Sequence, residues 1–216
     1  MFLLFDLDDT LHDKSASLAF CARRFQDEFS IDADPELFAD AFVTHHQIIQ
    51  PKDQVFNVLC HHFGLAAGMS AVLTKRFDAT FFEDATLFPG ALDALTELRG
   101  RGMKMGCVTN GRDFMQRAKI EALGLAPFFD VIITSGGYGV KKPDPAIFTA
   151  AMVALDATAT DCIFCGDNPR ADIEPARALG MRTIWKTRSL DAVPAADFKM
   201  TTFRELTDII DLIELG

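Results

Sequence analysis

Two acidic residues that follow a short apolar run are the first candidates for chemistry. Asp6 and Asp8 come directly after Phe2–Phe5, in the segment Asp-Leu-Asp-Asp-Thr. On an extended backbone, side chains two residues apart lie on the same side, so both carboxylates can serve one site while Leu7 points away. Neighbouring carboxylates repel each other, and a divalent cation relieves that repulsion. An acidic turn after a strand, which is common, explains the same residues without chemistry, so this segment alone gives only moderate support for a catalytic site.

Two further segments offer groups that can bind a phosphate. Thr109 and Asn110, followed by a glycine, place a hydroxyl and backbone N–H groups where they can hold phosphoryl oxygens, although Asn-Gly is also a strong turn signal. Lys141 and Lys142 precede Pro-Asp-Pro, whose prolines stiffen the loop and prepare a helix start. A lysine there can neutralise a phosphate. A solvated surface lysine is the alternative, and for Lys141 it is the preferred interpretation.

A second acidic segment lies later in the chain. It begins with Gly166, which allows close approach of the backbone after a strand, and continues with Asp167 at the strand end. Asp172 follows about one helical turn later and could instead cap a helix. Arg170, between the two acids, is interpreted as a surface or ion-pairing residue.

The spacing of apolar residues predicts the elements that position these segments. Alternating strands and helices predict a doubly wound α/β fold with a parallel sheet that is covered on both faces. The strands are expected at residues 2–5, 104–109, 131–134, 162–165 and 182–185, and the helices at about 89–98, 113–123, 144–154 and 170–179. Ligands bind beyond the carboxyl ends of such strands, and Asp6, Thr109 and Asp167 all lie at those ends.

Residues 14–84 have a different character. Apolar residues recur there at spacings of three and four, which predicts several amphipathic helices, with Pro35 and Pro51 at helix starts and Gly64 at a helix end. We therefore expect a helical cap domain at 14–84, inserted into a core that consists of 1–13 and 85–216. The hinges should lie near 11–14 and 84–89.

The histidines and phenylalanines of this insertion are interpreted as packing residues in preference to ligand-binding residues. It holds four of the five histidines, at positions 45, 46, 61 and 62. Paired histidines could contact an anion, but surface or packing histidines are more frequent. Its phenylalanines are expected to pack the insertion and not to line a pocket.

Composition excludes several classes of protein. The formal net charge of the 216 residues is -10 and no lysine or arginine cluster stands out, so nucleic-acid binding is disfavoured. No apolar run is long enough for a membrane helix, and the start of the chain lacks the features of a signal peptide. Five scattered cysteines suit a reducing cytosol, so we expect a cytoplasmic protein. Cys162 and Cys165 have C-x-x-C spacing, but core packing is preferred to a redox site.

In this order, the four segments resemble the motifs of the haloacid dehalogenase-like hydrolase superfamily. The matching patterns are its D-x-D-x-T, its strand-end threonine, its lysine before proline and its G-D-x-x-x-x-D. The resemblance spans Phe2 to about Trp185, and the insertion is similar to the helical cap of some members. In such members the cap should decide the substrate.

The resemblance implies a role for each matching residue. Asp6 would be the nucleophile and form an aspartyl-phosphate, while Asp8 would be the general acid and base. Thr109 and Lys142 would be catalytic residues that also bind the phosphate, with Asn110 beside them.

The resemblance also implies a metal. Mg²⁺ would be held by Asp6, Asp167 and the backbone carbonyl of Asp8, with Asp172 as a further ligand or as an orienting residue. The few direct ligands leave room for water and phosphate.

The implied function is a magnesium-dependent phosphatase. Its substrate would be a small phosphorylated metabolite of the nucleotide, sugar phosphate or phosphoglycolate type, and the protein would act as a monomer or homodimer. A phosphomutase on the same scaffold is the alternative, and a non-catalytic regulatory member is a further one. A haloacid dehalogenase comes last, because that branch lacks the acid found here as Asp8.

Overall fold

The computed structural model describes residues 1–48, 51–187 and 196–215. The chain forms two compact units. The first, here called the core unit, consists of Met1–Asp13 and Leu87–Gly216, and the second, called the helical unit, consists of Lys14–Thr86. The helical unit is thus inserted between the first two strands of the core unit. The assignment of residues 14–84 and of the remainder as cap and catalytic domains stays a prediction.

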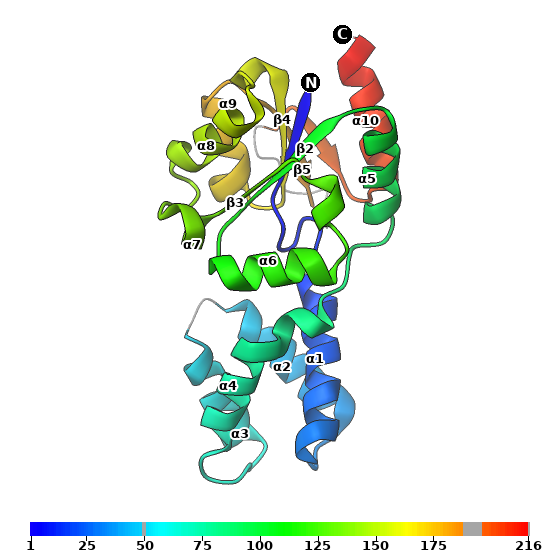
Figure 1. Ribbon diagram of the computed structural model, residues 1–216. Helices are drawn as coiled ribbons and strands as arrows, with labels where there is room; N and C mark the ends of the chain where they lie inside the picture. The colour runs from blue at the N-terminus through cyan, green and yellow to red at the C-terminus, as the bar shows by residue number, and fades with distance from the viewer. Residues whose placement is uncertain (49–50, 188–195, 216) are drawn as a thin grey trace. The chain divides into compact units, whose positions relative to one another are not determined.

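The core unit contains a six-stranded parallel sheet in the order β3-β2-β1-β4-β5-β6 (Figure 1). Its strands are β1 (Phe2–Phe5), β2 (Lys104–Thr109), β3 (Val131–Thr134), β4 (Cys162–Gly166), β5 (Arg182–Lys186) and β6 (Phe198–Met200). The predicted parallel α/β sheet is confirmed. Strands β4 and β5 each run one residue further than predicted, and β6 was not predicted.

Helices cover both faces of this sheet. α8 and α9 pack against one face and α5 and α10 against the other, as Figure 1 shows. The α-helices of the core unit are α5 (Ala91–Gly100), α6 (Asp113–Ala122), α7 (Ser135–Tyr138), α8 (Pro145–Leu155), α9 (Glu174–Ala178) and α10 (Arg204–Leu215). Short 3-10 helices occupy Ala126–Phe128 and Ala159–Asp161. The strands between these layers are apolar because water reaches neither face.

Two features of the helices differ from the sequence-based expectation. The helix predicted at 170–179 is a π-helical turn, Pro169–Ile173, followed by the short α9. The helix α10 was not predicted, although one side of it is apolar and buried, with Leu206 and Ile210 fully buried.

The helical unit is built from α1 (Lys14–Phe29), α2 (Pro35–Gln47), α3 (Lys52–His62), α4 (Met69–Thr80) and a 3-10 helix (Phe81–Asp84). Pro35 is the first residue of α2, where its missing N–H costs no hydrogen bond, and Asp34 caps that helix. Gly64 follows the end of α3 with φ 62°, a conformation that glycine adopts readily.

The core of the helical unit is aromatic. The predicted packing of its phenylalanines is confirmed, since Phe25, Phe42, Phe56 and Phe77 pack in one buried cluster. His46 is buried in the same cluster, in agreement with the interpretation of this histidine as a packing residue.

Two further findings concern the chain as a whole. Among the residues that the structure describes, no helix has the length and apolarity needed to cross a membrane. All five cysteines are free thiols, and Cys162 and Cys165 are buried in β4, as expected for core packing.

Candidate active site

The sheet register brings the predicted residues to one edge. Phe5 of β1 pairs with Cys107 of β2 on one side and with Cys165 of β4 on the other. The residues that follow these positions therefore emerge together, and the Asp6 N–H donates a hydrogen bond of 2.9 Å to the Cys165 carbonyl. This places Asp6 in the middle of the edge where ligands bind in such sheets.

Lys142 lies at the centre of the acidic residues. Its Nζ is 2.5 Å from Asp6 Oδ1 and 2.7 Å from Asp172 Oδ1, and its side chain is buried. Lys141 is exposed, in agreement with its interpretation as a surface residue. The two acids raise the pKa of Lys142 against the opposing effect of burial, so the lysine stays charged.

Asn110 positions Lys142 through the backbone. The Lys142 N–H donates to Asn110 Oδ1 at 2.8 Å, and Asn110 Nδ2 donates to the Lys142 carbonyl at 3.0 Å. The Asn110 side chain thus joins the loop after β2 to the loop before α8. Contact between Asn110 and a phosphate stays a prediction.

Three carboxylates form a candidate metal site. Asp6, Asp167 and Asp172 each offer one oxygen, and these oxygens all lie within 4.8 Å of one another. Burial, and then the charges of Asp172 and Asp167, raise the pKa of Asp6 to about 8 despite the opposing Lys142. Burial, Asp172 and Asp9 likewise raise the pKa of Asp167 to about 7. A single lysine therefore does not neutralise this group of acids.

These oxygens suit Mg²⁺. It is a hard cation that prefers oxygen ligands, and a divalent charge would offset the repulsion between these carboxylates, which adds to the effect of burial on both pKa values. Asp172 Oδ1 is buried, and within the described residues its close contact is the Lys142 ammonium, 2.7 Å away. A carboxylate oxygen in this position can also bind a hard cation. The predicted ligation by the Asp8 carbonyl stays a prediction.

Gly166 makes room for Asp172. A Cβ at position 166 would lie 2.6 Å from the Asp172 Cβ, Cγ and Oδ2 atoms, which no real side chain tolerates. The Asn168 N–H donates to Asp172 Oδ2 at 3.0 Å and fixes the carboxylate from the other side. The glycine of the second acidic segment is therefore required for the position of its last acid.

Asp8 has partners of its own. Its Oδ1 lies 2.6 Å from His12 Nδ1 and 2.5 Å from Lys119 Nζ, and Gln116 Nε2 donates to its Oδ2 at 3.3 Å. Burial alone would raise the pKa of Asp8, but Lys119 and His12 outweigh burial and hold the pKa well below its usual range. Asp8 is therefore outside the group of three carboxylates and in a positively charged environment.

Gln116 connects Asp8 to Thr109. Its Nε2 also donates to Thr109 Oγ1 at 2.7 Å, so one amide contacts the predicted general acid and the predicted phosphate-binding hydroxyl. A Cβ at Gly111 would come within 2.8 Å of the Gln116 side chain, so this glycine lets the loop pass over the glutamine.

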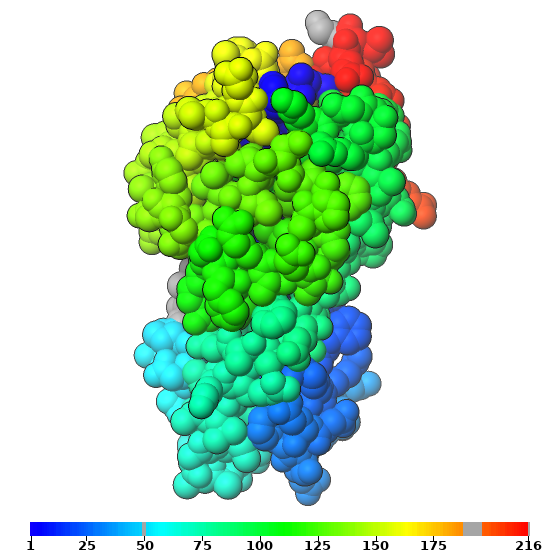
Figure 2. Space-filling view, in the orientation of Figure 1, coloured from blue at the N-terminus to red at the C-terminus, as the bar shows by residue number. Residues whose placement is uncertain are grey.

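Sequence reasoning missed His12, Gln116 and Lys119. A signal was present for the last two, because Met115, Gln116, Lys119 and Ile120 form the buried stripe of α6. Polar residues at positions where a helix should be apolar indicate a buried polar network. Figure 2 shows other residues of α6, in green, at the surface of the core unit.

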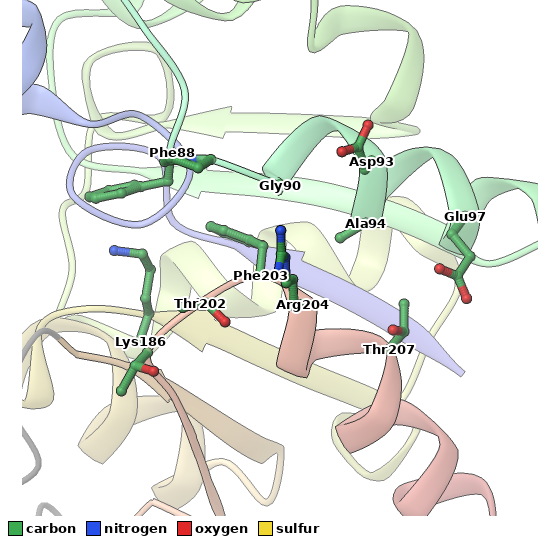
Figure 3. A pocket seen from close by; sticks show the side chains of 12 residues that line it. Phe88, Gly90, Asp93, Ala94, Glu97, Lys186, Thr202, Phe203, Arg204 and Thr207 are labelled. Atoms are coloured by element: carbon green, nitrogen blue, oxygen red, sulfur yellow. The ribbon is translucent and has the colours of Figure 1, made fainter.

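A cavity of about 610 Å³ lies between α5 and the start of α10. Lys186 and Phe88 line it from different elements, with Phe203 between α5 and α10 (Figure 3). Lys186 Nζ lies over the Phe88 ring and donates to the Asp9 carbonyl at 3.0 Å. Because Asp9 has φ 60°, an uncommon conformation for a residue with a Cβ, this bond helps to hold the loop in shape. None of the predicted site residues is among those that line the cavity.

The sequence is similar to a known family over most of its length. Residues 3–186 match the family profile described as haloacid dehalogenase-like hydrolase. The chain is 31% identical over 225 residues to the glyceraldehyde 3-phosphate phosphatase of Methanocaldococcus jannaschii, covering 96% of each chain. It is 30% identical over 236 residues to the ribulose-1,5-bisphosphate 5-phosphatase of Halopiger xanaduensis, covering 96% of this chain and 98% of that protein.

A solved structure agrees with the fold. The HAD-hydrolase YfnB of Bacillus subtilis, crystallised with magnesium, superposes with a TM-score of 0.76 at 26% identity. The match covers 97% of this chain and 98% of that one, so it includes both units of the present structure.

Proposed function

The chain belongs to the haloacid dehalogenase-like hydrolase family and is a phosphatase. We propose that it hydrolyses a small phosphorylated metabolite with Mg²⁺ bound, and that the reaction passes through an aspartyl-phosphate on Asp6. One observation carries the proposal. Asp6 directly follows strand β1, and its carboxylate lies 2.5 Å from Lys142 Nζ. With Asp167 and Asp172 it forms a group suited to a divalent cation.

The first step would be attack by an Asp6 oxygen on the phosphorus. The bond between phosphorus and the leaving oxygen breaks, and that oxygen takes a proton from Asp8. Because Lys119 and His12 keep the free carboxyl group ionised, Asp8 would acquire this proton when the anionic phosphate binds beside it. Lys142 reduces the repulsion between the Asp6 carboxylate and the phosphate. Bound Mg²⁺ would supply further positive charge at the same place.

The second step would return the enzyme to its starting state. The Asp8 carboxylate takes a proton from water, and the water oxygen attacks the phosphorus. The bond from phosphorus to the Asp6 oxygen then breaks and releases phosphate. Asp8 is protonated again, so atoms and charge balance over the cycle.

The substrate class is supported by the full-length relatives. Both are described as phosphatases of small phosphorylated sugars or aldehydes. We therefore propose sugar phosphates as the first compounds to test, followed by nucleoside monophosphates and phosphoglycolate. Asp8 and its partners disfavour dehalogenation, since halide leaves without a proton.

The test is phosphate release by the purified full chain from this panel, with and without Mg²⁺. We expect magnesium-dependent release, and a loss on the order of 10³-fold or more in Asp6→Asn. Asp208→Asn, at an exposed acid of α10, is the matched control and should behave as wild type. No release from any compound, or an unimpaired Asp6→Asn variant, would contradict the proposal. Isomerised sugar phosphate with little free phosphate would show a phosphomutase instead.

A further inference from the structure

The two oxygens of the Asp8 carboxylate are held unequally. Oδ1 has two close partners, His12 Nδ1 at 2.6 Å and Lys119 Nζ at 2.5 Å. Oδ2 has only the longer contact of 3.3 Å with Gln116 among the hydrogen bonds of the described residues. One oxygen is therefore fixed, and the other is the one that can exchange its partner for a substrate atom.

Exposure is also unequal in this network. The Asp8 side chain is 28% exposed, whereas the side chains of Lys119 and His12 are 4% and 0% exposed. The acid can thus be reached from outside, while the groups that hold its Oδ1 are covered. A ligand would meet Asp8 and not its two partners.

The burial of Lys119 needs an explanation. A lysine is rarely buried unless its charge is paired, because removing an ammonium from water is costly. Within the described part of the chain, its ion pair is with Asp8. Asp6 has a different lysine, Lys142, so each of the two acids of the first motif has a lysine of its own.

α6 places Lys119 beside Gln116, a residue that contacts both Asp8 and Thr109. Gln116 and Lys119 are three residues apart on this helix, hence on the same face. Gln116 reaches Thr109 as well as Asp8, so the helix face joins the phosphate-binding hydroxyl to the acid. A shift of this face would change the distance from Asp8 to a phosphate held at Thr109.

We propose that Lys119 is a positioning residue that, with His12, fixes Oδ1 of Asp8 so that Oδ2 faces the leaving oxygen of the substrate. This inference rests on the proposed function. In the first step, the proton that Asp8 takes up when the anionic phosphate binds moves from Oδ2 to the leaving oxygen as the bond to phosphorus breaks. The carboxylate that remains is held by Lys119 and His12.

The test compares two kinds of leaving group at saturating Mg²⁺. An alkyl phosphate needs a proton on its leaving oxygen, whereas p-nitrophenyl phosphate releases a stable anion and needs little help. The quantity to measure is kcat/KM, because it reports the steps up to release of the leaving group and not the later hydrolysis of the aspartyl-phosphate on Asp6. Lys119→Met should lower kcat/KM on the order of 10²-fold for the alkyl phosphate and less than about threefold for p-nitrophenyl phosphate.

Two further variants separate positioning from general damage. Arg117→Met removes a charge from the same helix, at a side chain that is 51% exposed and pairs with Asp113, and should leave both substrates unaffected. In an Asp8→Asn background, Lys119→Met should change the remaining p-nitrophenyl phosphate activity by less than about twofold, because the group it positions is gone. If circular dichroism shows that Lys119→Met is unfolded, Lys119→Gln takes its place in the same comparison.

The failures of the two proposals are distinguishable. A wild-type chain with no phosphatase activity refutes the proposed function. An active wild type whose Lys119 variant loses both substrates to the same extent refutes the positioning role alone. An added loss in the Asp8→Asn background would also refute it.

Discussion

The buried histidine of the helical unit should make that unit sensitive to acid. His46 is 2% exposed, and its ring lies on that of Phe42 with centroids 4.3 Å apart. Nδ1 is 2.8 Å from the Phe42 carbonyl and therefore carries the proton of the neutral ring. Nε2 has no hydrogen-bond partner within the described residues, so a second proton would find no acceptor.

The size of the effect follows from the pKa. Burial, assisted by the charge of Lys52, lowers the pKa of His46 from 6.5 to about 3. Below about pH 6.5 the unfolded chain binds a proton that the folded chain refuses, so the stabilisation is complete above that pH and is lost as the pH falls towards 3. At about 1.4 kcal/mol per pH unit, the loss between about pH 7 and about pH 5 comes to roughly 2 kcal/mol.

Urea unfolding followed by circular dichroism measures this loss. His46→Leu removes the titrating group, and His61→Leu, at an exposed histidine of α3, is the matched control. Wild type and His61→Leu should lose about 2 kcal/mol more free energy of unfolding than His46→Leu over that pH range. Parallel pH profiles for wild type and His46→Leu would refute the reasoning, whatever the stability of the variant at neutral pH.

Two other predictions concern the core unit. Gly166→Ala should displace the Asp172 carboxylate, because the added Cβ would overlap it. We expect the affinity for Mg²⁺, measured by titration calorimetry, to fall about 10- to 100-fold. Unchanged affinity would exclude Asp172 from the metal site. The thiols of Cys162 and Cys165 should react with an aromatic disulfide reagent only after unfolding, because the reagent cannot reach these buried groups and burial raises the pKa of both. Burial raises the pKa of Cys60 as well, but this thiol is partly exposed and should react in the native protein. Rapid labelling of Cys165 in the folded chain would contradict its packing role.

Most of the sheet was predictable because the five predicted strands are short, mostly apolar runs, and three of them lead to predicted site residues, namely Asp6, Thr109 and Asp167. The β4 sequence Cys-Ile-Phe-Cys-Gly is entirely buried, so it consists of apolar or small residues only and can be recognised as a core strand. β6 has three residues and α10 follows it, and neither was predicted. A strand of that length has too few residues for a period to be recognised.

The acids and Lys142 could be placed from the sequence because strand ends meet at one edge of a parallel sheet. The choice of Lys142 over Lys141 rested on the following proline and agrees with the burial of one and the exposure of the other. The partners of Asp8 could not be found in this way. Lys119 lies 111 residues from Asp8, and only the packing of α6 brings the two side chains together.

The central claim is that Asp6 becomes phosphorylated, and rapid acid quenching tests it most directly. The full chain would be mixed with Mg²⁺ and a substrate labelled in its phosphoryl group, then quenched within one turnover and digested with trypsin. Lys14 is the first cleavage site, so the peptide Met1–Lys14 contains Asp6. We predict label on this peptide at Asp6, and none in Asp6→Asn. An active enzyme that never carries label there, or carries it on another residue, would contradict the mechanism.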